Sequence, residues 1–289
     1  MQITNQLMTT NEAITEQTQT ATAMGVKKPG SFRKIRAIAV NTFWESVRDR
    51  VLYNLILFVL ILVAASVWVS ELSVDQETKF IADLGLSSML VFGALIAIFI
   101  GVALVYKEID KRTIYNLLSK PVERHEFIIG KYLGLCLTLL VNVAVMVVGT
   151  ELALLYVRGE FINLHLSILP AAFLIYLELC LIVAIALMFS SFSTPLLSAL
   201  FSFAIYVIGQ FSKDLQLAAQ LSQSDVTRAV LQVCYYLAPN LSNFSFITQA
   251  SHGQMPSRQL LLTATVYAVV YISLLLAAAV LIFQKRNFK

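Results

Sequence analysis

The sequence predicts an all-α integral membrane protein, and three observations lead to this fold class. Hydrophobic residues make up 58% of the 289 residues and charged residues only 13%, whereas in soluble domains roughly a quarter are charged. Several apolar runs reach the length of about 18 residues that a helix needs to cross a hydrocarbon core of about 30 Å. Lysine and arginine gather beside some of these runs and avoid others.

The apolar runs predict six transmembrane helices, at residues 51–70, 84–106, 132–156, 166–189, 195–211 and 259–283. The fifth run is the shortest, and the uncharged segment SSFSTP before it predicts a tight hairpin with the fourth. Residues 226–247 are also rather apolar, but Pro239 and the Asn and Ser residues after it disfavour a seventh crossing. We therefore expect an extracytoplasmic helical segment here that packs on, or dips into, the outer end of the bundle. Its apolar face repeats at helical spacing, at Val226, Ala229, Val230, Val233 and Leu237.

The distribution of basic residues predicts the orientation. Six crossings place both termini on one side, and sixteen of the 21 Lys and Arg residues lie on that side. Because basic residues of short loops are retained in the cytoplasm, both termini are expected to be cytoplasmic. The net charge of +4 then reflects topology, and it gives no reason to expect a nucleic-acid partner.

The N-terminal part divides into two regions. Residues 1–31 are rich in Thr, Gln, Asn and Ala and lack the apolar core of a signal peptide, so they are expected to form a disordered cytoplasmic leader. Residues 32–50 have apolar side chains on one helical face and basic ones elsewhere, which predicts an amphipathic helix in the inner membrane interface. The alternative is a cytoplasmic extension of the first crossing. Residues 284–289 form a basic cytoplasmic tail.

Motifs of membrane and soluble enzymes are missing from the sequence. It contains neither HExxH nor a Gly-x-Ser-Gly setting with a His in a span, and GxxxxGK[ST] does not occur. The three Cys and three His residues are scattered, with no pattern of a metal site. We therefore expect no catalytic residues, metal or cofactor, and no ATP hydrolysis of the P-loop type by this chain.

Two carboxylates fall inside predicted spans, where ionisable groups are costly. Glu151 lies in the last turns of its span and can reach water near the interface. Glu178 lies near the middle of the fourth span, so it must face a protein interior, a subunit interface or a wet pathway. Lining of a pathway and a structural hydrogen bond between helices remain equal alternatives for Glu178.

The polar segment 106–131, between the second and third spans, has an organised pattern. Ile109, Thr113, Ile114, Leu117 and Leu118 share one face of a short amphipathic helix. Pro121 ends this helix, because proline disfavours helical geometry in the residue before it and donates no hydrogen bond. A second short helix is expected at 123–129, leading into the third span.

At this segment the sequence resembles the permease subunits of type-2 ABC transporters, in particular the exporter-like group. The matching residues are Glu108, Arg112, Thr113, Leu117, Leu118, Pro121, Arg124, Glu126, Gly130 and Lys131. The resemblance extends over nearly the whole chain, including the SSFST turn after the fourth span and PNLSNF before the last. Arg112 departs from the family pattern, where many relatives have Gly before the Thr, and the leader lies outside it.

The resemblance implies a mechanism and partners. In this family two permease chains, identical or different, pair with two separate ATP-binding subunits in the cell (inner) membrane, and the helix between the second and third spans docks on each ATPase. The residues expected to couple to the ATPase here are Glu108, Arg112, Thr113, Ile114, Leu117, Leu118, Lys120, Pro121 and Arg124. Within this set Ile114, Leu117 and Leu118 would form an apolar knob, and the charged residues would form its polar rim.

Two other classes of function stay open at the level of sequence. A membrane scaffold or assembly factor would have the same spans without transport. A secondary transporter is disfavoured, because the sequence lacks internal repeats and spans interrupted by Gly and Pro. The cargo is not set by the sequence, and export is an expectation from the family resemblance alone.

Overall fold

The computed structural model of the chain describes residues 30–48, 57–58, 61–62, 64, 77–110, 123–158, 163–222 and 224–285. At 104–110, 124, 158, 163–165, 237 and 284–285 it describes the backbone alone. The predicted leader (1–31), first crossing (51–70) and tail (284–289) therefore lie wholly or mostly outside the described residues.

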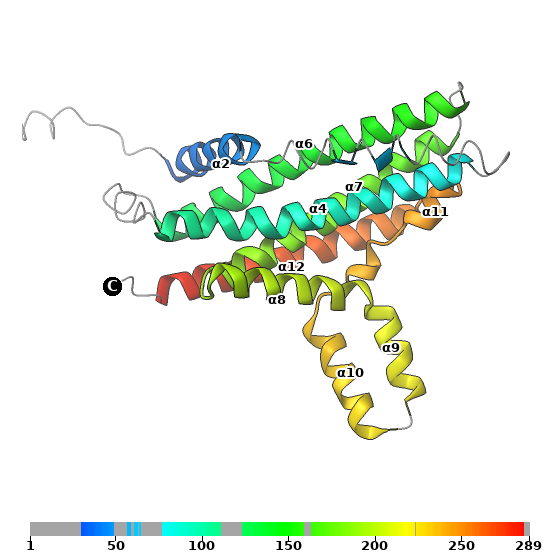
Figure 1. Cartoon of the computed structure of the whole chain (residues 1–289). Coiled ribbons are helices and arrows are strands. Elements are labelled where there is room, and N and C mark those ends of the chain that lie inside the picture. Colours follow the sequence, from blue (N-terminus) through cyan, green and yellow to red (C-terminus); the bar gives the residue numbers. More distant parts are fainter. Residues whose placement is uncertain are drawn as a thin grey trace, which may run out of the picture.

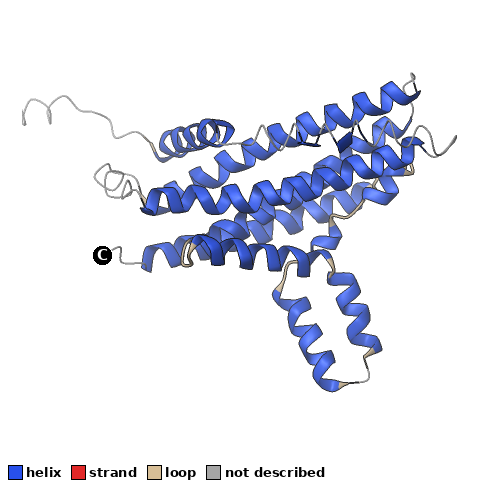
Figure 2. Ribbon diagram, in the orientation of Figure 1, coloured by secondary structure: helices blue, strands red, loops and turns tan. Residues whose placement is uncertain are grey.

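Long helices that run side by side form the body of the molecule (Figure 1). They are α4 (Glu77–Asp110), α6 (Arg124–Arg158), α7 (Asn163–Ser190) and α12 (Arg258–Lys285). In the part of the chain that is described, every regular element is a helix (Figure 2). Four of these helices are long and apolar enough to cross a membrane, and a fifth crossing results if α8 and α9 are taken together. The all-α membrane fold class is thus confirmed for the described residues.

Helix α7 is the centre of the bundle. Its side chains are buried without interruption from residue 178 to residue 187, because α4, α6, α8 and α12 surround it. Helix α12 is the opposite case, since few of its side chains are buried and apolar ones such as Leu262 and Val266 are exposed. An exposed apolar face of this length is the expected surface of a helix that borders lipid.

Helices α4 and α6 extend well beyond the predicted spans. They contain 34 and 35 residues, which gives lengths of about 50 Å at 1.5 Å per residue against a hydrocarbon core of about 30 Å. The prediction of a separate short helix at 123–129 was wrong, because residues 124–129 are the first turns of α6. Helix α6 continues through Gly130. At this glycine α2 (Ser31–Arg48) approaches α6 closely.

The fifth predicted span is short and ends in a bend. Helix α8 (Pro195–Gln210) has 16 residues, or about 24 Å, and α9 (Ser212–Leu221) leaves it at an angle of 64°. The turn before α8 is held by the Ser191 and Ser193 amides, which donate to the Leu187 and Phe189 carbonyls over 3.1 and 3.0 Å. Pro195 then occupies the first turn of α8, where its missing N–H costs nothing.

The region between α8 and α12 differs from the expectation of a segment packed on the bundle. Helices α9 and α10 (Asp225–Leu237) form a hairpin that projects away from the bundle (Figure 1). The predicted apolar face of α10 therefore stays open, with Val226 74% and Val233 64% exposed. The part that does pack on the bundle is η1 (Leu241–Asn243) with α11 (Ile247–Ser251), whose neighbour Ser167 on α7 donates to the Ala250 carbonyl over 2.8 Å.

Candidate functional site

Two of the predicted ATPase-coupling residues lie at the end of the bundle where α4 ends and α6 begins. Glu108 lies in the last turn of α4, and Arg124 is the first residue of α6. For both residues the structure describes the backbone alone. The other predicted coupling residues lie outside the described residues: Arg112, Thr113, Ile114, Leu117, Leu118, Lys120 and Pro121. The structure therefore describes the two helices that carry this segment, together with their contacts.

Helix α2 contacts the first turns of α6 at this end of the bundle (Figure 1). Glu126 of α6 is 2% exposed and lies 3.3 Å from Lys34 Nζ. The same carboxylate accepts hydrogen bonds from the Ser31 hydroxyl and, over 3.0 Å, from the Glu123 amide. A buried carboxylate is tolerated only with such partners, so Glu126 joins α2, α6 and the residue that precedes α6.

A second charged side chain is buried five residues further along α6. The Lys131 side chain is 2% exposed, and its Nζ lies 3.5 Å from Glu45 Oε2 on α2. The same ammonium lies 5.8 Å from the centre of the Phe127 ring, within the range of a cation–π contact. Two ion pairs of opposite direction, Lys34 to Glu126 and Glu45 to Lys131, thus link α2 and α6.

Two glycines of α6 let the backbones of α2 and α6 approach closely. A Cβ at Gly134 would lie 2.6 Å from both the Ala39 carbonyl oxygen and Thr42 Cβ, and one at Gly130 would lie 2.8 Å from Ile38 Cβ. The spacing of four residues places both glycines on one face of α6, as in the Gly-x-x-x-Gly contacts of membrane helices. We call the set Ser31, Lys34, Glu45, Glu126, Gly130, Lys131 and Gly134 the α2–α6 contact.

Glu178 lies inside the bundle, on the buried stretch of α7. Its side chain is 1% exposed and interacts with Gln210 at the end of α8. Within the described part of the chain, its Oε1 has no hydrogen-bond partner. The carboxylate thus faces the last turn of α8, next to the bend between α8 and α9.

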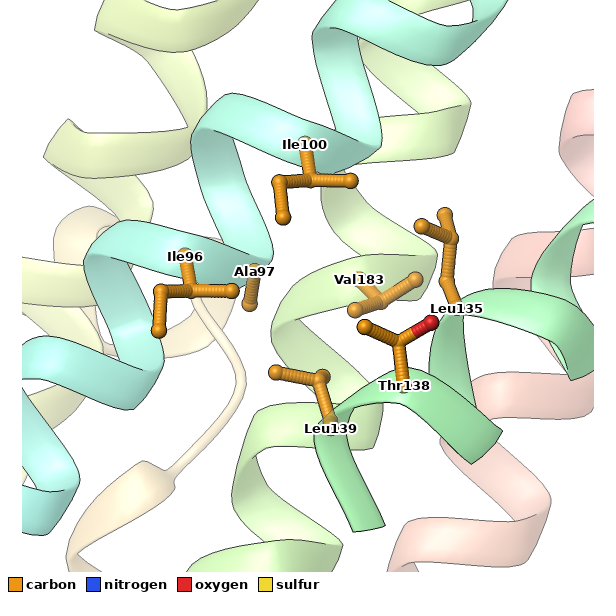
Figure 3. Close-up of a pocket in the computed structure, with 7 residues that line it drawn as sticks. All are labelled: Ile96, Ala97, Ile100, Leu135, Thr138, Leu139 and Val183. Carbon is orange, nitrogen blue, oxygen red and sulfur yellow. The ribbon is translucent and has the colours of Figure 1, made fainter. Parts of the chain in front are cut away.

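An apolar gap lies between α4, α6 and α7 (Figure 3). Figure 3 shows the side chains around it, which are Ile96, Ala97, Ile100, Leu135, Thr138, Leu139 and Val183. Its one polar member, Thr138, donates to the Gly134 carbonyl over 3.0 Å. The space is about 10 Å³, the lower limit for a single water, so this gap reflects packing between spans and does not suit a ligand.

A network of uncharged groups holds the bend between α8 and α9. The Ser212 hydroxyl donates to Asn240 Oδ1 over 2.6 Å, and the Ser242 hydroxyl donates to the same oxygen over 2.7 Å. The Asn240 amide in turn donates to the Tyr267 hydroxyl of α12 over 2.8 Å. At Gly209 a Cβ would lie 2.7 Å from the Pro239 carbonyl oxygen, so the chain after α10 returns directly against the end of α8. We call Ser212, Asn240, Ser242 and Tyr267 the bend network.

The family of ABC-2 family transporter proteins matches residues 36–288. The chain belongs to this family. No curated protein matches it. The ABC-2 assignment confirms the resemblance found in the sequence and supports a multi-pass membrane permease of an ABC transporter. Both the α2–α6 contact and the bend network lie mostly within the matched residues of this ABC-2 protein.

Sequence reasoning missed the role of four residues in this ABC-2 protein. Glu126, Gly130 and Lys131 were assigned to the family pattern without a structural role, and Gly134 was not considered. The spacing Gly130-Lys-Tyr-Leu-Gly134 was a usable signal for close helix packing. Which helix it contacts could not be read from the sequence, because α2 and α6 are separated by more than seventy residues.

Proposed function

We propose that this chain is a six-span permease subunit of an ABC exporter. Two such chains form the translocation pathway, and separate ATP-binding subunits dock on residues 108–124 and hydrolyse the ATP. The observation that carries the proposal is the α2–α6 contact. Its residues on α6, from Glu126 to Gly134, come directly after the docking segment in the sequence. The ABC-2 family match supports the permease part, while export is taken from the family resemblance.

The α2–α6 contact explains how a movement of the docking segment would reach the membrane helices. Helix α6 begins at Arg124, at the end of the docking segment, and continues without a break to Arg158. Because Glu126 and Lys131 join α2 to the first turns of α6, a displacement at the segment would move α2 and α6 together. Such rigid-body motion is the usual way in which a docked partner changes a membrane domain.

The arrangement of the described helices supports the six-span topology. Helix α2 lies at one end of the bundle and α4 begins at the other (Figure 1), so residues 49–76 must connect opposite ends. The last turns of α12 lie at the same end as α2 (Figure 1), which agrees with both termini on one side. The distribution of basic residues makes that side the cytoplasm.

The pathway is proposed to lie between two permease chains. Helix α7 is buried along residues 178–187, and the gap between α4, α6 and α7 has room for about one water. The centre of one chain is therefore packed at this level, at a density that leaves no route for a solute. Helix α12, with its exposed apolar face, remains available to a second chain or to lipid.

The test replaces the apolar knob of the docking segment. Leu117→Asp with Leu118→Asp should abolish co-purification of the ATP-binding subunit and transport-coupled ATPase activity, because two carboxylates cannot enter a desolvated groove. Insertion into the membrane should be unchanged. The matched control is Asn116→Asp, which adds a carboxylate to the same segment outside the apolar face. Normal assembly of the double variant would refute the docking assignment, and a chain that never recruits an ATPase would favour a scaffold.

A further inference from the structure

An open pocket lies at the end of the bundle away from α2, and the proposed coupling makes no use of it. Residues of α9, η1, α11 and the first turns of α12 surround about 600 Å³ of space. These helices meet beside the projecting hairpin (Figure 1). Ligand pockets of proteins commonly have volumes of about 300–1,000 Å³, so this pocket is large enough for a small organic ligand.

The lining of the pocket combines one cation with many neutral polar groups. Lys213 is its one charged residue, and no Asp or Glu is among the residues that line it. The neutral hydrogen-bonding groups come from Ser242, Asn243, Ser245, Gln249, Ser257, Gln259 and Thr263. A lysine provides three donors and no acceptor, so the pocket is complementary to an anion that carries hydroxyl groups. A lining without carboxylates does not suit a metal ion or an organic cation.

Apolar side chains form the remaining wall of the pocket. Phe246 lies between η1 and α11, while Leu260 and Ala264 come from the face of α12 that also carries Tyr267. The neighbouring face of α12 presents Leu262, which is 66% exposed and would border lipid. A ligand with an anionic head and an apolar part would match both surfaces.

The walls of this pocket are fixed before any ligand binds. Lys213 Nζ donates to the Ser242 carbonyl over 3.1 Å, which uses one of its three protons. Ser242 and Tyr267 also belong to the bend network, so they are held by Asn240. Side chains that are already positioned lose little conformational freedom on binding, and this favours recognition.

We propose that this pocket binds the phosphate-bearing, hydroxylated headgroup of an anionic amphiphile. Lys213 would pair with the phosphate, the hydroxyl and amide groups would bind the headgroup hydroxyls, and the acyl chains would lie along the apolar face of α12. This inference is independent of the coupling proposal, because binding is measured on the purified full-length chain without an ATPase.

The test measures lipid retention by native mass spectrometry, with phosphatidylglycerol and phosphatidylcholine of identical acyl chains. The wild-type chain should retain phosphatidylglycerol preferentially, and Lys213→Gln should reduce that retention about fivefold, as expected for one partly exposed ion pair. Lys79→Gln is the matched control, because it removes a lysine from α4 outside the pocket. Equal retention by Lys213→Gln and wild type would overturn the proposal.

Lys213→Gln also removes the hydrogen bond to the Ser242 carbonyl and could disturb the fold in that way. A second variant therefore tests the pocket without changing Lys213. Thr263→Phe fills the pocket from α12, where the Thr263 hydroxyl bonds only to carbonyls of its own helix, Gln259 and Leu260. Leu262→Phe places the same ring on the adjacent, lipid-facing side. Retention should fall for Thr263→Phe alone, and an equal loss in both variants would overturn the site.

Two further measurements decide the source of the ligand. If soluble glycerol 3-phosphate displaces phosphatidylglycerol at equal concentration, the ligand is a free phosphate ester and the acyl-chain part of the proposal is overturned; failure to compete supports the amphiphile. If Thr263→Cys forms a disulfide between two chains in the membrane, a second copy covers the pocket and the proposal is wrong.

Discussion

At the end of the bundle where α2 lies, charged side chains are buried beside glycines, whereas near α11 the contacts between elements use hydroxyl and amide groups. Glu126 and Lys131 form ion pairs across α2 and α6, while Ser212, Ser242 and Asn240 form neutral hydrogen bonds around the bend. Separating a buried ion pair costs more than exchanging one neutral hydrogen bond for another. The first end is therefore suited to transmit a displacement as one body, whereas a single contact at the second end contributes less to stability.

The largest effect on stability is expected for the ion pair of Glu126. Lys34→Met leaves that buried carboxylate without its cation and should lower the free energy of unfolding by about 3 kcal/mol, measured as the shift of thermal unfolding in detergent. Arg33→Met is the control, since Arg33 is an exposed basic residue on the same helix. Adding Glu126→Gln to Lys34→Met should restore part of the loss. Purely additive effects of the two changes would contradict the pair.

The close approach of α2 and α6 gives the next largest effect. In Gly134→Ala the new Cβ would meet the Ala39 carbonyl, and since backbone must move, we expect a loss of about 1–3 kcal/mol. On the same helix, a Cβ at Gly149 would have its nearest contact at 3.5 Å, from Phe58. Gly149→Ala should therefore leave stability unchanged or raise it by up to about 1 kcal/mol. Equal losses in both variants would show that helix propensity decides, rather than the contact.

A smaller effect is expected at the bend network. Ser212→Ala removes the hydroxyl that donates to Asn240 and should cost about 1 kcal/mol, the usual value for a neutral hydrogen bond. Ser222→Ala, in the same hairpin at an exposed hydrogen bond, should change stability by less than about 0.5 kcal/mol. If Ser212→Ala were as destabilising as Lys34→Met in the same unfolding experiment, the contrast between the two ends would be wrong.

The smallest effect on stability is expected at Glu178, and its readout is transport. Glu178→Gln keeps the shape of the side chain and its interaction with Gln210, so expression and thermal stability should stay at the wild-type level. If the carboxylate of Glu178 lines the pathway, Glu178→Gln changes the transport rate in proteoliposomes. The control is Glu151→Gln, near the C-terminal end of α6, which should leave the transport rate unaltered. Unchanged transport for Glu178→Gln would assign Glu178 a structural role.

The sequence was sufficient for features that depend on local composition. Apolar runs predicted α7 and α12 almost to their ends, because burial in a bilayer demands a continuous apolar helix. The starts of α4 and α6 were predicted too late, since Lys79 and Glu126 are charged and apolar content alone excludes them from a span. A helix was expected at 123–129, but not its continuity with the third span.

Features that depend on distant contacts could not be predicted in this way. The apolar face expected of residues 32–50 includes Phe32, yet Phe32 is 80% exposed and the residues buried against α6 include Thr42 and Ser46. Thr42 is buried there because it lies against Gly134, which has no side chain to keep α2 at a distance. The projection of α9 and α10 was missed for a similar reason, since their apolar faces gave no sign of the 64° bend before them.

The claim that α2 and the first turns of α6 move as one body has a direct test. Spin labels at exposed Ala37 of α2, Leu137 of α6 and Leu196 of α8 report the distances between these helices. They are placed on a chain without its native cysteines and assembled with its ATP-binding subunit. On addition of ATP and vanadate, we predict an unchanged distance from 37 to 137 and a changed distance from 37 to 196. A change in the first distance would contradict the account.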